Sequence, residues 1–65
     1  MSHSKKIGKK LIMEHYHRGR ADQRAGRAFA APSDSVLRRS YSEGYADEIM
    51  GIDPTEDEIL FIVQG

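Results

Sequence analysis

Apolar and small residues recur with helical spacing in the first half of the chain. The intervals alternate between four and three residues, which places these positions on one face of a helix: Ile12, Tyr16, Gly19, Gln23, Gly26 and Ala30. Pro32 has no amide hydrogen and disfavours helical geometry at Ala31. The pattern therefore predicts a first helix over residues 7–30.

A second helical pattern follows the proline. Residues 33–35 are Ser, Asp and Ser, and all three types favour the N-cap position. Gly51 can end this helix, and Asp53-Pro54 prevents its continuation. We predict a second helix over residues 34–50, with these inward positions: Leu37, Tyr41, Gly44, Tyr45, Glu48 and Ile49.

The last segment is acidic and then strongly apolar. Thr55 and Glu58 fit a capping box, which favours a short helix over residues 55–63. The apolar run is also rich in strand-forming residues, so an extended element is the alternative. Five consecutive apolar residues cannot stay exposed, and we expect them to dock on the two helices or on a second copy. We place a homo-oligomer interface on Ile59, Leu60, Phe61, Ile62 and Val63.

Each predicted helix carries two glycines seven residues apart, Gly19 and Gly26 in the first, Gly44 and Gly51 in the second. Glycine inside a helix costs about 1 kcal/mol relative to alanine. Close approach of another backbone would compensate, so we expect Gly26 and Gly44 at helix–helix contacts. The predicted fold is all-α, a two-helix hairpin with a short C-terminal element. It forms a single domain over residues 1–65, of which residues 1–6 are flexible.

The charge distribution divides the chain. The net charge of the 65 residues is zero, but residues 1–45 sum to +6 and residues 46–65 to −6. Such an asymmetry indicates a nucleic acid or another anionic partner for the basic part. The alternative is a dipolar small protein whose tail pairs with its own body.

Three arginines of the first helix, Arg20, Arg24 and Arg27, stand at i, i+4 and i+7 and form one basic ridge. Guanidinium groups suit phosphate oxygens, although a solvated face has the same pattern. The tyrosines beside Gly44 either fill space left by glycines of the facing helix or stack on an unpaired base. We assign RNA contact to Arg18, Arg20, Arg24, Arg27, Arg38, Arg39, Tyr41 and Tyr45.

Several kinds of site are not indicated. The chain has no cysteine, so it has neither a disulfide nor a thiolate metal site. His15 and His17 point in opposite directions on a helix, and His3 lies in the flexible start, so we expect no metal. No nucleophile or phosphate-loop motif occurs, and chains this small rarely enclose a catalytic pocket. We expect a non-enzyme without cofactor.

The length of the apolar runs bears on the cellular location of the protein. No run has the length of a signal peptide or a membrane span. We therefore expect a cytoplasmic protein without a membrane partner.

The spacing of glycines and aromatic residues resembles ribosome modulation factor, a small hibernation protein of bacteria. The matching segments lie within about residues 9–51: His17-Arg18-Gly19, Ala25-Gly26-Arg27, Arg39-Ser40-Tyr41 and Gly44-Tyr45. That family has tryptophans where this chain has tyrosines. The resemblance implies a two-helix protein that binds the ribosome or ribosomal RNA and acts in translation regulation. The alternative is a small, phage-encoded inhibitor or adaptor that binds a protein and oligomerises through its apolar tail.

Overall fold

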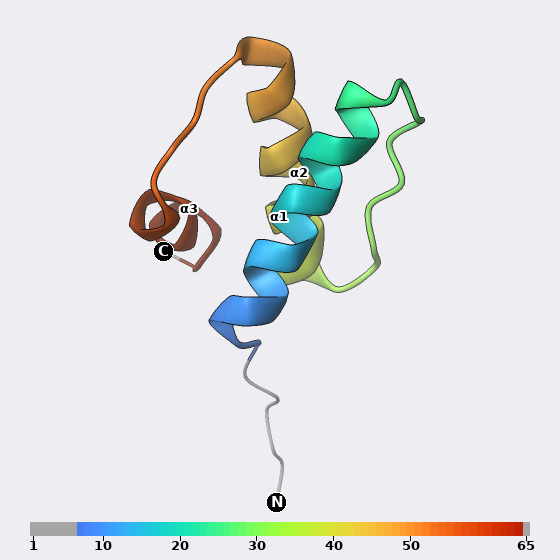
Figure 1. The fold of residues 1–65 in the computed structure, drawn as a ribbon. Coiled ribbons are helices and arrows are strands. Elements are labelled where there is room, and N and C mark those ends of the chain that lie inside the picture. Colours follow the sequence, from blue (N-terminus) through green and yellow to red (C-terminus); the bar gives the residue numbers. More distant parts are fainter. Residues whose placement is uncertain (1–6, 65) are drawn as a thin grey trace, which may run out of the picture.

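The computed structural model describes residues 7–64, which form three helices and no strand (Figure 1). The predicted all-α class, the packed pair of helices and the short C-terminal helix are confirmed. The predicted flexibility of residues 1–6 lies outside the described residues. The helices are α1 (Lys9–Arg24), α2 (Ser35–Met50) and α3 (Glu56–Gln64).

Helices α1 and α2 lie side by side and run in the same direction, because the connection between them returns along the pair (Figure 1). The pair is therefore parallel and differs from the predicted hairpin, whose helices would be antiparallel. Ser40 Oγ donates to the carbonyl oxygen of Ile12 near the start of both helices. Arg20 Nε lies 3.1 Å from Glu48 Oε1 near their ends. Each helix has 16 residues, about 24 Å in length, and the extended chain from residue 25 to residue 34 spans this distance easily.

Helix α1 ends at Arg24, so the predicted end near residue 30 is wrong. Gly26 has a φ of 75° and caps the helix in the left-handed conformation. The amide of Gly26 donates to Gln23 O at 3.1 Å and that of Arg27 to Asp22 O at 2.8 Å, the pattern of a Schellman motif. A Cβ at Gly26 would meet nothing within 4 Å, so its expected place at a helix contact is also wrong.

The other helix ends follow the sequence signals. Asp34 is the N-cap of α2, and its carboxylate accepts the amides of Val36 and Leu37, both at 3.0 Å. The capping box of α3 is confirmed: Thr55 Oγ1 accepts the Glu58 amide at 3.2 Å, and Glu58 Oε1 accepts the Thr55 amide at 2.7 Å. Gly51, with a φ of 71°, ends α2.

Glycines bring the two helix backbones into contact. A Cβ at Gly19 would lie 2.9 Å from the amide nitrogen of Tyr45 and closer still to the carbonyl oxygen of Tyr41. A Cβ at Gly44 would lie 2.9 Å from the carbonyl carbon of Tyr16 and closer still to its oxygen. Any side chain at either position would therefore push the helices apart. The expected role of Gly44 is confirmed, and its partner is Gly19 instead of Gly26.

The core lies between the helix pair and α3. Its buried members are Ile12, Tyr16, Ile59 and Val63. The apolar tail therefore folds back on its own helices: Ile59 and Val63 are buried, and half-buried Leu60 packs against the same core. Ile49 is 62% exposed, and its expected inward position is wrong. Asp47 and Glu48 take the inward positions at this end of α2, where they bind Tyr16 and Arg20.

We predict that Gly19→Ala and Gly44→Ala each lower the melting temperature strongly, because the new methyl group meets backbone that cannot move alone. Overpacking costs about 1–3 kcal/mol, and each kcal/mol is worth about 4–8 °C in a domain this small. Gly8→Ala is the control, since a Cβ there meets nothing within 4 Å and only a favourable N-cap residue is lost. Equal melting temperatures for the three variants would contradict the close approach.

Candidate functional site

The two long helices carry the same seven-residue pattern, Tyr-x-x-Gly-x-Ala-Asp. It reads YHRGRAD over residues 16–22 and YSEGYAD over residues 41–47, 25 positions later. The capping glycines, Gly26 and Gly51, follow at the same offset. The repeat is not among the features predicted above, although it is visible in the sequence once the two helices are aligned by their glycines.

The repeated tyrosines and aspartates bind each other across the helix pair. Tyr16 OH donates to Asp47 Oδ2 at 2.7 Å, and Tyr41 OH donates to Asp22 Oδ2 at 2.5 Å. Tyr41 is fully buried and Tyr16 is 2% exposed. Each repeat therefore supplies a hydroxyl to the carboxylate of the other, and the two contacts are related by an approximate two-fold axis along the helices.

The residue after each glycine extends this symmetry. Arg20 donates to the carbonyl oxygen of Ile52 at 2.6 Å, and Tyr45 donates to that of Arg27 at 2.9 Å. Ile52 and Arg27 occupy equivalent places just after the capping glycines. Each repeat thus fixes the segment that leaves the other one. Phe29, in the segment that leaves α1, lies edge-on to the rings of Tyr41 and Tyr45, with centroids 5.2 Å apart in both pairs.

Arg20 is a structural residue. Its guanidinium group donates to Tyr16 OH at 2.9 Å, to Glu48 at 3.1 Å and to Asp53 at 2.8 Å, and its side chain is only 14% exposed. These bonds join α1 to the end of α2 and to the segment that leads to α3. The donors of Arg20 are therefore occupied inside the molecule, which disfavours the predicted RNA contact of this residue.

The rest of the predicted ridge is also paired. Arg24 binds Glu48 at 3.1 Å, and Arg27 binds Asp22 at 2.9 Å. Arg27 lies beyond the end of α1, so the helical i, i+4, i+7 ridge does not form. Both side chains are more than half exposed, and such surface pairs contribute only about 0–1 kcal/mol each. The two ion pairs are therefore weak, but the positive charges of Arg24 and Arg27 are already compensated by two carboxylates.

The tyrosines differ from both sequence interpretations. Tyr41 cannot stack on a base, because its ring is buried and its hydroxyl also accepts the Ala30 amide at 3.1 Å. Tyr45 is half-buried and packs against Phe29. The space beside the glycines is filled by backbone and not by tyrosine rings.

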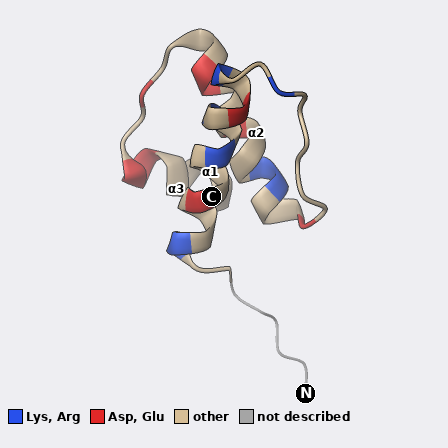
Figure 2. Ribbon diagram, turned by 45° about the vertical axis from the view of Figure 1, so that its right-hand side comes forward, with Lys and Arg blue, Asp and Glu red and all other residues tan. Residues whose placement is uncertain are grey.

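The three remaining arginines, Arg18, Arg38 and Arg39, are exposed. No carboxylate of residues 7–64 forms an ion pair with them. Figure 2 shows basic positions along α1 and near the start of α2. Acidic positions lie on the upper part of α2 and at the start of α3, and others lie on α1 and in the connecting segments. Of the predicted RNA contacts, these three alone are exposed and without an acidic partner among the described residues.

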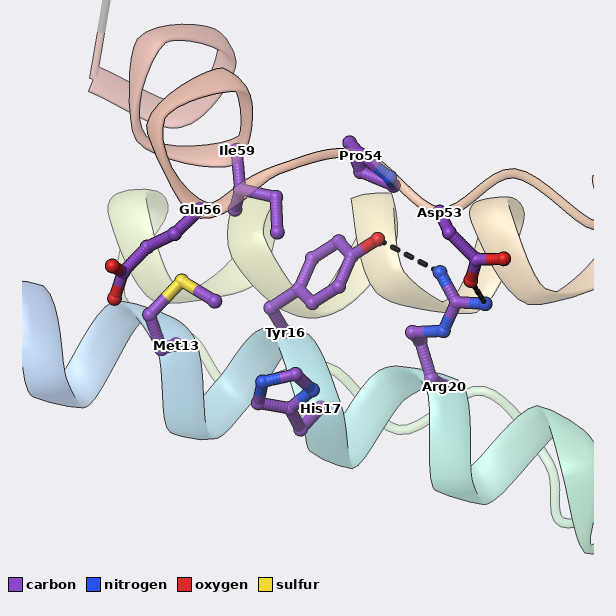
Figure 3. Close-up of a pocket in the computed structure, with 8 residues that line it drawn as sticks. All are labelled: Met13, Tyr16, His17, Arg20, Asp53, Pro54, Glu56 and Ile59. Atoms are coloured by element: carbon purple, nitrogen blue, oxygen red, sulfur yellow. Dashed lines mark hydrogen bonds and ion pairs between the residues drawn. The ribbon is translucent and has the colours of Figure 1, made fainter.

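A cavity of about 390 Å³ lies between α1 and the segment that leads into α3 (Figure 3). Tyr16 and Arg20 point into it from α1, and Ile59 faces them from α3. Its charged groups already have partners: Arg20 binds Asp53, and Glu56 lies 3.7 Å from Lys9. His17 also lines the cavity and contacts the Tyr16 ring edge-on. The charged groups of the cavity thus serve the docking of the tail.

A second, larger hollow lies on the outer side of the same segment. It has a volume of about 690 Å³, and we call it the acid-rimmed groove; it is lined by Ile52, Asp53, Pro54, Asp57, Glu58, Phe61 and Ile62. Phe61 is 77% exposed, whereas Ile59 and Val63 are buried in the core. The structure thus divides the predicted oligomer interface. Ile59 and Val63, one helical turn apart, lie in the core, and half-buried Leu60 packs against it. Phe61 and Ile62 remain exposed.

The described residues contain no group of three His, Asp or Glu side chains that is placed to bind a metal ion. His3 lies outside that range. From residue 7 to residue 64, no helix is both long and apolar enough to cross a bilayer.

Comparison with known proteins gave no matching family model, curated protein or solved structure.

The paired groups have shifted pKa values. Burial raises the pKa of Tyr16 to about 12, and the hydrogen bond to Asp47 acts in the same direction. The hydrogen bond from Tyr41, followed by that from Arg27, lowers the pKa of Asp22. The hydrogen bond from Arg24 lowers the pKa of Glu48. These contacts therefore favour the neutral form of Tyr16 and Tyr41 and the ionised form of Asp22 and Glu48.

We predict that Arg20→Lys destabilises the protein and loosens the segment after α2, because an ammonium group cannot reproduce the planar fork that reaches several acceptors. Hydrogen exchange should accelerate at the amides of Ile52 and Thr55 and in α3. Arg24→Lys is the matched control, since the Arg24 side chain is 69% exposed and bonds only to Glu48. Equal exchange rates in the two variants would show that Arg20 does not fix the tail.

We also predict a loss of stability in alkaline solution that depends on Tyr16. Its folded pKa of about 12 exceeds the unfolded value of about 10, so the folded state binds this proton more tightly. The resulting stability is complete below pH 10 and is lost as the pH rises from 10 to 12. Tyr16→Phe should cost about 1.5–3 kcal/mol at neutral pH and show a shallower alkaline decline. The measurement is the urea midpoint of both proteins as the pH rises from 10 to 12. An equal decline of the midpoint in the two proteins would refute the role of Tyr16.

Proposed function

We propose that the protein is a small binding module, an adaptor or inhibitor, that engages a partner protein through the acid-rimmed groove and acts by binding instead of catalysis. The observation that carries the proposal is Phe61, a large aromatic side chain that is 77% exposed at this groove. Ile52 and Ile62 beside it are 45% and 38% exposed. Apolar side chains gathered in one exposed hollow are typical of protein interaction sites.

Both walls of the groove are fixed by contacts inside the chain. On one side, Arg20 binds the carbonyl oxygen of Ile52 at 2.6 Å and the carboxylate of Asp53 at 2.8 Å. On the other side, Ile59 and Val63 anchor α3 in the core. A partner therefore meets a formed surface, which lowers the entropic cost of binding. This supports a recognition role for the exposed apolar residues.

RNA binding in translation regulation or hibernation, which the resemblance to ribosome modulation factor implies, is the second candidate. It is favoured by Arg18, Arg38 and Arg39, which are exposed and have no carboxylate partner within residues 7–64. It is disfavoured by the burial of Tyr41 and by the internal bonds of Arg20. The net charge of zero also weakens the attraction to phosphate. We therefore place the protein partner first.

Affinity capture with two matched variants tests the proposal. Phe61→Asp removes the exposed aromatic from the groove, and Ile49→Asp introduces the same charge at a 62% exposed position that does not line it. We expect the wild type and Ile49→Asp to retain a partner protein from a lysate of the native cells, with or without ribonuclease. Phe61→Asp should lose that partner.

Two outcomes would contradict the proposal. A protein retained equally by Phe61→Asp does not bind at the groove. Capture of ribosomal components that ends with ribonuclease, or with the combined change of Arg18, Arg38 and Arg39 to Gln, would establish the RNA function in its place.

A further inference from the structure

We infer that the acid-rimmed groove accepts a basic amphipathic segment of a partner protein. In this segment, each bulky apolar side chain has a Lys or Arg within about one helical turn of it. This inference rests on the proposed function and names the chemistry of its partner. It follows from the charges around the groove, from their spacing along α3 and from the partners that those charges disfavour.

The lining of the groove has one sign of charge. Three carboxylates border it, from Asp53, Asp57 and Glu58, and no Lys or Arg lines it. No cation of residues 7–64 forms an ion pair with Asp57 or Glu58. The Asp53 side chain is 85% exposed although it binds Arg20. A cation of a partner would therefore meet carboxylates that remain accessible beside the apolar floor.

The spacing along α3 couples charge to apolar contact. Asp57 and Glu58 precede Phe61 by four and three residues, and Glu58 precedes Ile62 by four. Residues at these separations are neighbours on one face of a helix. A partner side chain that covers Phe61 therefore has a carboxylate within one helical turn. An amphipathic helix laid in a groove matches this arrangement, because its apolar anchors and its flanking residues share the same period.

The same charges argue against other occupants. Nucleic acids, anionic lipid surfaces and acidic peptides would bring negative charge to three carboxylates. A second copy placed groove to groove would bring Asp57 and Glu58 of the two molecules together, so the groove is not complementary to itself. The homo-oligomer predicted from the sequence stays a prediction, but this groove favours a different, basic chain.

Binding of synthetic helical peptides measures the inference directly. Three fluorescent peptides of about four turns share one leucine face and carry Lys, Gln or Glu on the other. We expect the Leu/Lys peptide to bind most tightly, with an affinity that falls as salt is added. Asp57→Lys should weaken it several-fold, up to roughly tenfold, whereas Glu14→Lys, the same charge change on the exposed side of α1, should leave it nearly unchanged.

The apolar contribution has its own pair of variants. Phe61→Ser should weaken the Leu/Lys peptide, and Ile49→Ser, at a similarly exposed position outside the groove, should not. Circular dichroism of all variants shows whether they keep the helical content of the wild type, and comparisons are made among those that do.

The inference is wrong if the Leu/Gln or Leu/Glu peptide binds as tightly as the Leu/Lys peptide, or if none of the three binds. It is also wrong if light scattering shows a dimer of the wild type that Phe61→Ser dissociates, since the occupant is then a second copy. The capture experiment with Phe61→Asp does not depend on the charge of these peptides. The proposed function can therefore hold even if this inference fails.

Discussion

The contact of two helix backbones at Gly19 and Gly44 is the constraint on which the rest of the molecule depends. Each glycine meets the carbonyl group of a tyrosine in the other helix, at a distance that leaves no room for a side chain. At this separation each tyrosine hydroxyl crosses the pair and reaches an aspartate on the other side. The cost of glycine inside two helices is thus offset by close packing and by buried hydrogen bonds.

The repeat also explains the charge distribution. Four carboxylates of the chain, Asp22, Asp47, Glu48 and Asp53, bind hydroxyl or guanidinium groups that the repeat brings to them. The arginines of the apparent ridge therefore stabilise the fold or lie in compensated surface pairs. What remains exposed is of two kinds: scattered arginines on the long helices and an acidic, apolar groove at the tail. The proposed function follows from this division.

Most of the secondary structure could be predicted from the sequence because its signals are local. The caps at Asp34, Thr55 and Gly51 depend on neighbouring residues alone, and the structure has all three. The predicted end of α1 is wrong because the apolar period continues past Gly26. The left-handed conformation of Gly26 ends the helix before that period does. The arginine ridge failed for another reason. Arg20 and Arg24 pair with Glu48 only because the two helices pack in parallel, and helical spacing within one segment cannot show that. Arg27 lies beyond the end of α1 and pairs locally with Asp22.

The central claim is that the two repeats meet reciprocally at their glycines, and nuclear Overhauser contacts of the glycine Hα protons test it most directly. The structure predicts contacts from Gly19 to the backbones of Tyr41 and Tyr45, and from Gly44 to those of Tyr16 and Arg20. Both sets must be present, since the close approach is shared by the two glycines. Contacts from one glycine without the other, or contacts between the end of α1 and the start of α2 as in an antiparallel pair, would contradict the account.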